Sequence, residues 1–143
     1  MSQSRREFIK TSAAGACVLA GLGLVGFLES CVSTKNVVAV KQENGKITVP
    51  LKEWDTQKMK ILLAPDMQFG IAVIKVSDTS YRALSMRCTH RNVELNANSG
   101  GFNCPAHGSA FDLEGNVTNG PAAEPLQKYT ATIEGENLVV LIS

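Results

Sequence analysis

The chain has 143 residues, with 14 Lys or Arg against 13 Asp or Glu, and its formal net charge is +1. From residue 32 onward eleven basic residues balance eleven acidic ones, without a basic run. Nucleic-acid-binding proteins usually show a basic surplus or stripe, so we expect no nucleic-acid partner.

Residues 1–31 differ in character from the rest of the chain. Residues 4–10, Ser-Arg-Arg-Glu-Phe-Ile-Lys, form a twin-arginine export motif, and an uncharged stretch rich in Ala, Gly, Leu and Val covers residues 11–28. This stretch is at the lower edge of the length that spans a membrane. We therefore predict an N-terminal hydrophobic helix within residues 1–31, acting as a signal or as a membrane anchor.

Residues 28–31, Leu-Glu-Ser-Cys, offer a second means of attachment. They resemble a loose lipobox whose Cys31 would be acylated after cleavage, although Glu29 departs from the small or apolar residue usual there. Because both retention and lipidation attach the protein to a membrane, we expect attachment rather than free release. Residues 32–143 are predicted as one domain with a modest core, on the extracytoplasmic side of a bacterial inner membrane.

This domain has the sequence pattern of a β protein. Seven segments alternate or run apolar with β-branched residues, and we predict them as strands: 37–40, 46–49, 60–63, 71–76, 81–86, 129–133 and 137–142. Residues 77–80 would close one hairpin, and Gly135 permits the tight reversal of another. No segment after residue 32 has a convincing helical period. The first strand and the C-terminal hairpin are expected to share a base sheet.

Two short segments place the only two histidines of the chain beside cysteines. Residues 88–90 are Cys-Thr-His, and after thirteen residues the segment 104–109 is Cys-Pro-Ala-His-Gly-Ser. Each loop can offer a thiolate and an imidazole together, which predicts a metal site. Common zinc modules pair like residues, as C-x2-C followed by H-x3-5-H, so this mixed order favours an iron–sulfur cluster over zinc. Structural zinc remains an alternative, as does a Cys88–Cys104 disulfide that would leave both histidines without a purpose.

These loops resemble the cluster loops of the Rieske [2Fe–2S] family. Residues 88–90 resemble the first loop, residues 104–112 the second, and Gly120-Pro121-Ala122 looks like the proline loop that shields the cluster. The resemblance implies one [2Fe–2S] cluster, with both thiolates on one iron and both imidazoles on the other. The implied ligands are Cys88, His90, Cys104 and His107.

The same resemblance implies a fold and explains the leader. The expected fold is all-β, with small antiparallel sheets stacked together and a cluster-binding subdomain inserted at one tip, after the N-terminal helix. Strand periodicity alone gives only the all-β class. A cluster assembled in the cytoplasm requires a folded chain before export, and the twin-arginine route carries folded cargo.

Rieske subunits of cytochrome bc-type complexes take an electron from quinol and pass it to a c-type haem. By resemblance we expect b-type and c-type cytochrome subunits as partners, with quinol at the exposed edges of His90 and His107, and no independent turnover. Two alternatives remain, namely the small subunit of another periplasmic oxidoreductase, resembling that of arsenite oxidase, and a Rieske ferredoxin feeding a ring-hydroxylating oxygenase. The export signal argues against the ferredoxin, because such systems draw on cytoplasmic NADH.

Two departures from the high-potential family members affect the expected redox potential. Those members join an extra cysteine in each loop as a disulfide, and the corresponding positions here are Val93 and Ala106. They also place a tyrosine, which donates to a ligating sulfur, where this chain has Phe111. Ser109 remains and would donate to a bridging sulfide. We therefore expect a redox potential between those of the ferredoxin-type oxygenase components and those of the respiratory Rieske proteins that use ubiquinol. Such a potential would suit a low-potential donor such as menaquinol.

Other conspicuous residues have plainer interpretations. Trp54 is expected in the core or an interface, Phe102 beneath the cluster loops, and Asp112 as a cap on the following turn. Arg87 and Arg91 are expected to be solvated loop residues.

Overall fold

The computed structural model describes residues 36–54 and 57–142, which form an all-β domain. The predicted N-terminal helix, the domain boundary after residue 31 and Cys31 lie outside the described residues. Among the residues that are described, no helix is long and apolar enough to cross a membrane.

The described chain forms twelve strands and one short 3-10 turn. They are β1 (Val37–Ala39), β2 (Gln42–Glu43), β3 (Lys46–Pro50), the turn η2 (Leu51–Trp54), β4 (Met59–Leu63), β5 (Ile71–Lys75), β6 (Tyr81–Ser85), β7 (Asn96–Asn98), β8 (Gly101–Asn103), β9 (Ala110–Phe111), β10 (Val117–Asn119), β11 (Lys128–Glu134) and β12 (Asn137–Leu141).

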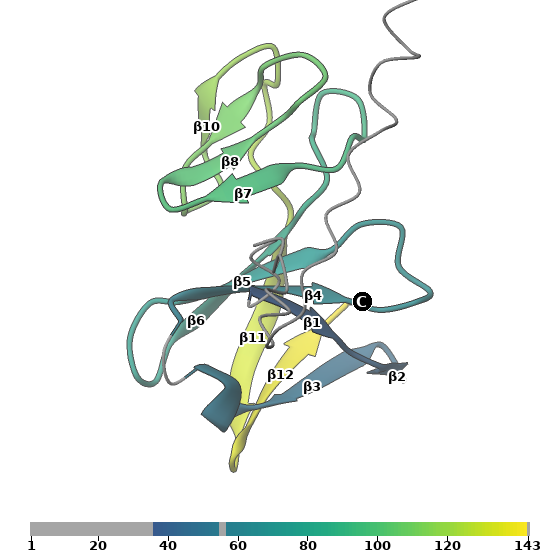
Figure 1. The fold of residues 1–143 in the computed structure, drawn as a ribbon, viewed down its shortest axis with the longest axis vertical. Coiled ribbons are helices and arrows are strands. Elements are labelled where there is room, and N and C mark those ends of the chain that lie inside the picture. Colours follow the sequence, from purple (N-terminus) through teal and green to yellow (C-terminus); the bar gives the residue numbers. More distant parts are fainter. Residues whose placement is uncertain (1–35, 55–56, 143) are drawn as a thin grey trace, which may run out of the picture. The chain divides into compact units, whose positions relative to one another are not determined.

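Eight strands make the base sheet, in the order β1-β4-β5-β6-β11-β12-β3-β2. β11 joins its two halves, because Lys128 and Tyr129 pair with β6 while its remaining residues pair with β12. The first strand and the C-terminal hairpin therefore share one sheet, as predicted. The four short strands β10-β9-β8-β7 form a separate antiparallel sheet. Figure 1 shows this small sheet at one end of the domain, beyond β5 and β6.

One edge of the base sheet departs from the antiparallel pairing that was expected. β1 pairs with β4 in parallel, with Val37 opposite Ile61 and Ala39 opposite Leu63. The chain passes through β2, β3 and η2 between these two strands. A parallel pair needs such a long connection, whereas the hairpins of this chain allow only antiparallel pairing.

β5 is buried on both faces, which explains its apolar sequence from Ile71 to Ile74. Ile71 and Val73 belong to a core with β3 and β12, whereas the alternate residues Ala72 and Ile74 face a second core. Because successive strand residues point to opposite faces, one strand serves two cores. The second core extends to the cluster loops, and its other buried members include Met86, Cys88, Leu95, Phe102, Cys104, Phe111 and Leu126. A rigid platform thus lies directly beneath the predicted site.

The predicted strands agree with the observed ones to within about one residue at each end. Both predicted turns are confirmed: backbone hydrogen bonds join Ser77 and Ser80, and Gly135 has a φ of 61°. Trp54 is 2% exposed in the core, where its ring packs edge-on against Tyr81, as expected. β2 and all four strands of the small sheet were not predicted.

Candidate metal centre

The first loop of the predicted site, loop 1, comprises residues 88–93 and follows β6. The N–H of Cys88 donates to the carbonyl of Val93 at 2.9 Å, and the N–H of Asn92 donates to the carbonyl of Cys88 at 2.9 Å. Asn92 has a φ of 48°, a left-handed conformation that asparagine tolerates better than most residues. These bonds close a tight loop around Thr89 and His90.

Loop 2, residues 104–109 between β8 and β9, repeats this backbone arrangement. The N–H of Cys104 donates to the carbonyl of Ser109 at 2.8 Å, and that of Gly108 donates to the carbonyl of Cys104 at 3.1 Å. Gly108 has a φ of 78°, at the loop position that Asn92 occupies in loop 1. In both loops, therefore, the first residue is a cysteine held at a fixed turn, and a histidine follows two or three residues later.

A third segment, residues 119–124, contacts both loops, and we call it the shielding segment. The side-chain amide of Asn119 donates to the carbonyl of Gly108 at 2.9 Å, and the N–H of Ala122 donates to Ser109 Oγ at 3.1 Å. The hydroxyl of Thr89 donates to the carbonyl of Glu124 at 2.7 Å. The segment also contains a cis peptide bond between Gly120 and Pro121. The loops are thus joined through this third segment.

The four predicted ligands meet as two like pairs. Cys88 and Cys104 are both buried and free of any disulfide, and the thiol of Cys88 donates a hydrogen bond to the sulfur of Cys104. The rings of His90 and His107 lie edge to face, with centroids 4.9 Å apart. His107 is exposed and His90 is half-buried. The alternative of a Cys88–Cys104 disulfide is therefore not found.

The environment of Cys104 favours the thiolate. Burial alone raises the pKa of a thiol, but hydrogen bonds from the N–H groups of Ala106 and His107 and from the Cys88 thiol oppose it, and the net pKa is lowered. A metal ligand must be the thiolate. Loop 2 therefore prepares its cysteine for binding through the same backbone that forms the turn.

The donor set fits a [2Fe–2S] cluster of mixed ligation. His90 Nδ1 is buried and has no hydrogen-bond partner among the described residues, so it is the ring atom free to bind a metal. Within the described ranges no three His, Cys, Asp or Glu groups are placed to hold one ion. The two loops thus offer one pair of sulfurs and one pair of imidazole rings, which are the two thiolates and two imidazoles that such a cluster takes on separate irons.

The residues around the pairs are placed largely as predicted. Ser109 is fully buried, and Phe102 and Phe111 pack in the core with both cysteines. Asp112 caps the following turn, since its carboxylate accepts from the N–H groups of Glu114 at 2.9 Å and Asn116 at 2.8 Å. Arg87 and Arg91 are exposed, as expected.

Sequence reasoning missed the contacts that join the three segments. Asn119 and Thr89 stand beside recognised motifs, but nothing in their type or spacing shows that their side chains reach carbonyls 11 and 35 residues away. The only available signal is position, because Asn119 directly precedes the Gly-Pro-Ala sequence and Thr89 lies between two predicted ligands.

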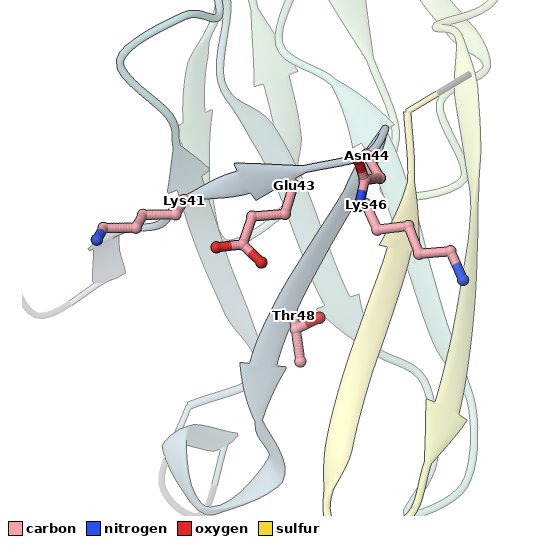
Figure 2. A pocket seen from close by; sticks show the side chains of 5 residues that line it. All are labelled: Lys41, Glu43, Asn44, Lys46 and Thr48. Carbon is pink, nitrogen blue, oxygen red and sulfur yellow. The ribbon is translucent and has the colours of Figure 1, made fainter.

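A polar surface hollow of about 600 Å³ is formed by residues that are distant in sequence from these loops. It is lined by Lys41, Glu43, Asn44, Lys46 and Thr48, around the turn from β2 to β3. Figure 2 shows the amino groups of Lys41 and Lys46 pointing to opposite sides, so they do not converge on a common ligand.

Comparison with known proteins gives a consistent family assignment. The model of the Rieske [2Fe–2S] domain family matches residues 48–130, which is more than half of the chain. The plasma-membrane Rieske protein PetC3 from Synechocystis PCC 6803 has a similar structure, with a TM-score of 0.53 and 26% identity, covering 64% of this chain and 93% of that one.

Curated relatives match over shorter segments. The cytochrome b6-f complex iron-sulfur subunit of Synechococcus sp. (strain JA-3-3Ab) is 40% identical over 57 residues, which are 38% of this chain and 33% of that protein. The mitochondrial Rieske subunit of the cytochrome b-c1 complex of Gallus gallus is 42% identical over 57 residues, covering 38% and 21%. The carotenoid phi-ring synthase of Chlorobaculum tepidum is 40% identical over 63 residues, covering 43% and 10%. The chain thus spans a third or less of the length of these relatives.

Proposed function

Since the chain belongs to the Rieske [2Fe–2S] domain family, and is thereby an iron–sulfur electron carrier that binds a [2Fe–2S] cluster, we propose that the cysteines and histidines of loops 1 and 2 are the cluster ligands. The ligands would be Cys88 and Cys104 on one iron and His90 and His107 on the other. The pairing of the two sulfurs and of the two rings supports this proposal. Membership of this family favours a [2Fe–2S] cluster over the structural zinc site that the sequence left as an alternative.

We propose further that the protein is the iron–sulfur subunit of a membrane quinol-oxidising complex of the bc type, taking electrons from quinol and delivering them to a c-type haem. Two curated relatives are subunits of cytochrome b6-f and b-c1 complexes. The observation that supports the proposal most is the accessibility of the histidine pair, because quinol must reach the outward ring edges. Pro105, Ala106 and Gly108, which flank His107 in the chain, are uncharged and exposed.

Each part of the site has a separate task in this proposal. When bound, the cluster supplies a one-electron redox couple at a potential raised by its imidazole ligands. The buried cysteines would hold the inner side of the cluster, and Ala122, the buried residue of the shielding segment, covers Ser109 there. His90 would hold the cluster through Nδ1, and Nε2 would then be left to hold a proton or to accept a hydrogen bond from a quinol hydroxyl. A deprotonated Nε2 would accept the proton of that hydroxyl, and the cluster would supply the acceptor for one electron of the quinol.

Membrane attachment through residues 1–31 belongs to the same proposal, with the domain on the extracytoplasmic side. The export motif and the apolar stretch of the sequence support it. Membrane-complex subunits among the curated relatives are consistent with it.

Purification of the full chain from detergent-solubilised membranes of its source tests this function. We expect b-type and c-type haem to copurify, and a menaquinol analogue to reduce the cluster of the isolated complex. Copurification with a molybdopterin subunit and without haem would instead identify an arsenite-oxidase-like partner. A cluster potential too low for reduction by any quinol would contradict quinol oxidation and favour an oxygenase ferredoxin.

A further inference from the structure

The loops of this site are held together without the covalent link that the resemblance implies for high-potential members. Val93 and Ala106 occupy the positions of the two extra cysteines. Loop 1 is tied to the shielding segment by Thr89 and Glu124, and loop 2 is tied to it by Asn119 and Ser109. The shielding segment therefore takes the place of a direct connection between the loops.

Asn119 is the residue that fixes this segment on loop 2. Its amide nitrogen donates to two carbonyls at once, that of Gly108 at 2.9 Å and that of Gly120 at 3.0 Å. Gly108 is the residue before Ser109, and Gly120 begins the Gly-Pro-Ala sequence. One side chain thus joins the carbonyl next to the buried serine to the start of the shielding segment.

This link affects the orientation of the Ser109 hydroxyl. Ser109 Oγ accepts the N–H of Ala122 at 3.1 Å, and Ser109 has no exposed surface. A hydroxyl that accepts on one side retains its own hydrogen for another acceptor. Asn119 holds Gly108, which precedes Ser109, close to Gly120, which lies two residues before Ala122. It thereby keeps the Ala122 N–H within hydrogen-bond distance of Ser109 Oγ, and this bond constrains the direction of the hydroxyl hydrogen.

We propose that Asn119 is a positioning residue for the redox centre, and that it acts through Ser109 by fixing the shielding segment against loop 2. The proposal depends on the proposed role of Ser109 as a hydrogen-bond donor to the cluster. Loss of the Asn119 amide frees the Ala122 N–H and with it the orientation of the serine hydroxyl. A weaker hydrogen bond to the cluster destabilises its more negative, reduced form.

A double-mutant cycle on the full chain tests the proposal. Asn119→Leu removes both donated hydrogen bonds, which are present in either oxidation state and largely cancel from the potential. The expected shift comes from the weakened hydrogen bond of the Ser109 hydroxyl, and we expect the equilibrium constant for cluster reduction to fall roughly threefold to tenfold, because a hydrogen bond of ordinary strength changes an equilibrium by a factor of this order. The shift has the same direction as that of Ser109→Ala and is no larger. In the Ser109→Ala background, Asn119→Leu causes no further shift, since the group through which Asn119 acts is already absent.

Thr118→Val is the matched control, because Thr118 is the neighbouring exposed residue of β10 and its side chain forms no hydrogen bond among the described residues. Asn119→Ala serves as a second variant if leucine disturbs folding. The measurements are the midpoint potential, from spectroscopic titration, and the EPR g values of the reduced protein. A potential equal to that of Thr118→Val, or a shift that adds fully to that of Ser109→Ala, overturns the proposal. Absence of a cluster from the wild-type protein would instead refute the proposed ligands.

Discussion

Replacement of Ser109 by alanine tests how the protein side of the site sets the redox potential. Ser109 has no exposed surface, and its hydroxyl accepts the N–H of Ala122 at 3.1 Å. The substitution removes an acceptor from this N–H and a donor from the proposed cluster site. Ala122 is itself buried, so no bulk water replaces the lost acceptor.

The two losses have different effects. The unpaired N–H of Ala122 costs roughly 1–3 kcal/mol in both oxidation states, so it lowers stability and largely cancels from the potential. The lost donor affects mainly the reduced state, and a hydrogen bond to a charged group is worth about 1.5–3 kcal/mol. With about 59 mV for each tenfold change in a one-electron equilibrium, the midpoint potential of Ser109→Ala falls by roughly 65–130 mV at most.

Potentiometric titration of the full chain, followed by the visible spectrum, measures this shift. Ser99→Ala is the matched control, since Ser99 is exposed in the turn between β7 and β8. An unchanged midpoint in Ser109→Ala, or a rise, would refute the assignment of Ser109 as a donor to the cluster.

Three further predictions concern the platform beneath the site. Phe111→Tyr adds a hydroxyl beside the buried cysteines, and we expect the midpoint potential to rise if the hydroxyl donates to a ligating sulfur; a titration that shows a fall contradicts this. Gly101→Ala places a Cβ against the backbone carbonyl oxygen of Phe111, so the melting temperature should drop in line with a loss of about 1–3 kcal/mol of stability. Gly100→Ala, whose added Cβ has its nearest contact at 3.5 Å, should be tolerated. Burial raises the pKa of the Asp112 carboxyl, but hydrogen bonds from the Asn116 side chain and from backbone N–H groups outweigh this effect, and the net pKa is lowered. The ionised carboxylate therefore contributes stability that is present above about pH 4 and is lost as the pH falls through the pKa of the folded protein. Urea unfolding should therefore show that Asp112→Asn loses less stability in acid than the wild type does. An equal loss in both proteins would contradict the stabilising role of the ionised Asp112 carboxylate.

The long strands of the base sheet could be predicted because their sequences carry the signal of burial. β5, Ile71–Lys75, is apolar up to Ile74 since it faces two cores, and β3, Lys46–Pro50, alternates since it faces one. The parallel pairing of β1 with β4 could not be predicted in the same way, because strand periodicity contains no information on the partner or its direction.

The small sheet escaped prediction because its strands are too short to show a period. β7 is Asn-Ala-Asn and β8 is Gly-Phe-Asn, and asparagine and glycine are depleted in strands. Their pairing depends on the closure of loop 2 and on contact between Phe102 and the core, which are tertiary effects.

The ligands could be proposed from the sequence because cysteine and histidine are rare in this chain and stand together at loop spacings. The residues that hold the loops could not be identified in this way, since Asn119 and Thr89 each reach a carbonyl that is distant in sequence. Such contacts are fixed by the fold and leave no local pattern in the sequence.

The most direct test of the account is EPR spectroscopy of the dithionite-reduced full chain, together with analysis of its iron and acid-labile sulfide. Mixed thiolate and imidazole ligation predicts about two irons and two sulfides for each chain and a mean g value typical of nitrogen-ligated [2Fe–2S] centres. A silent spectrum with stoichiometric zinc, or a mean g value of an all-cysteine cluster, would contradict it.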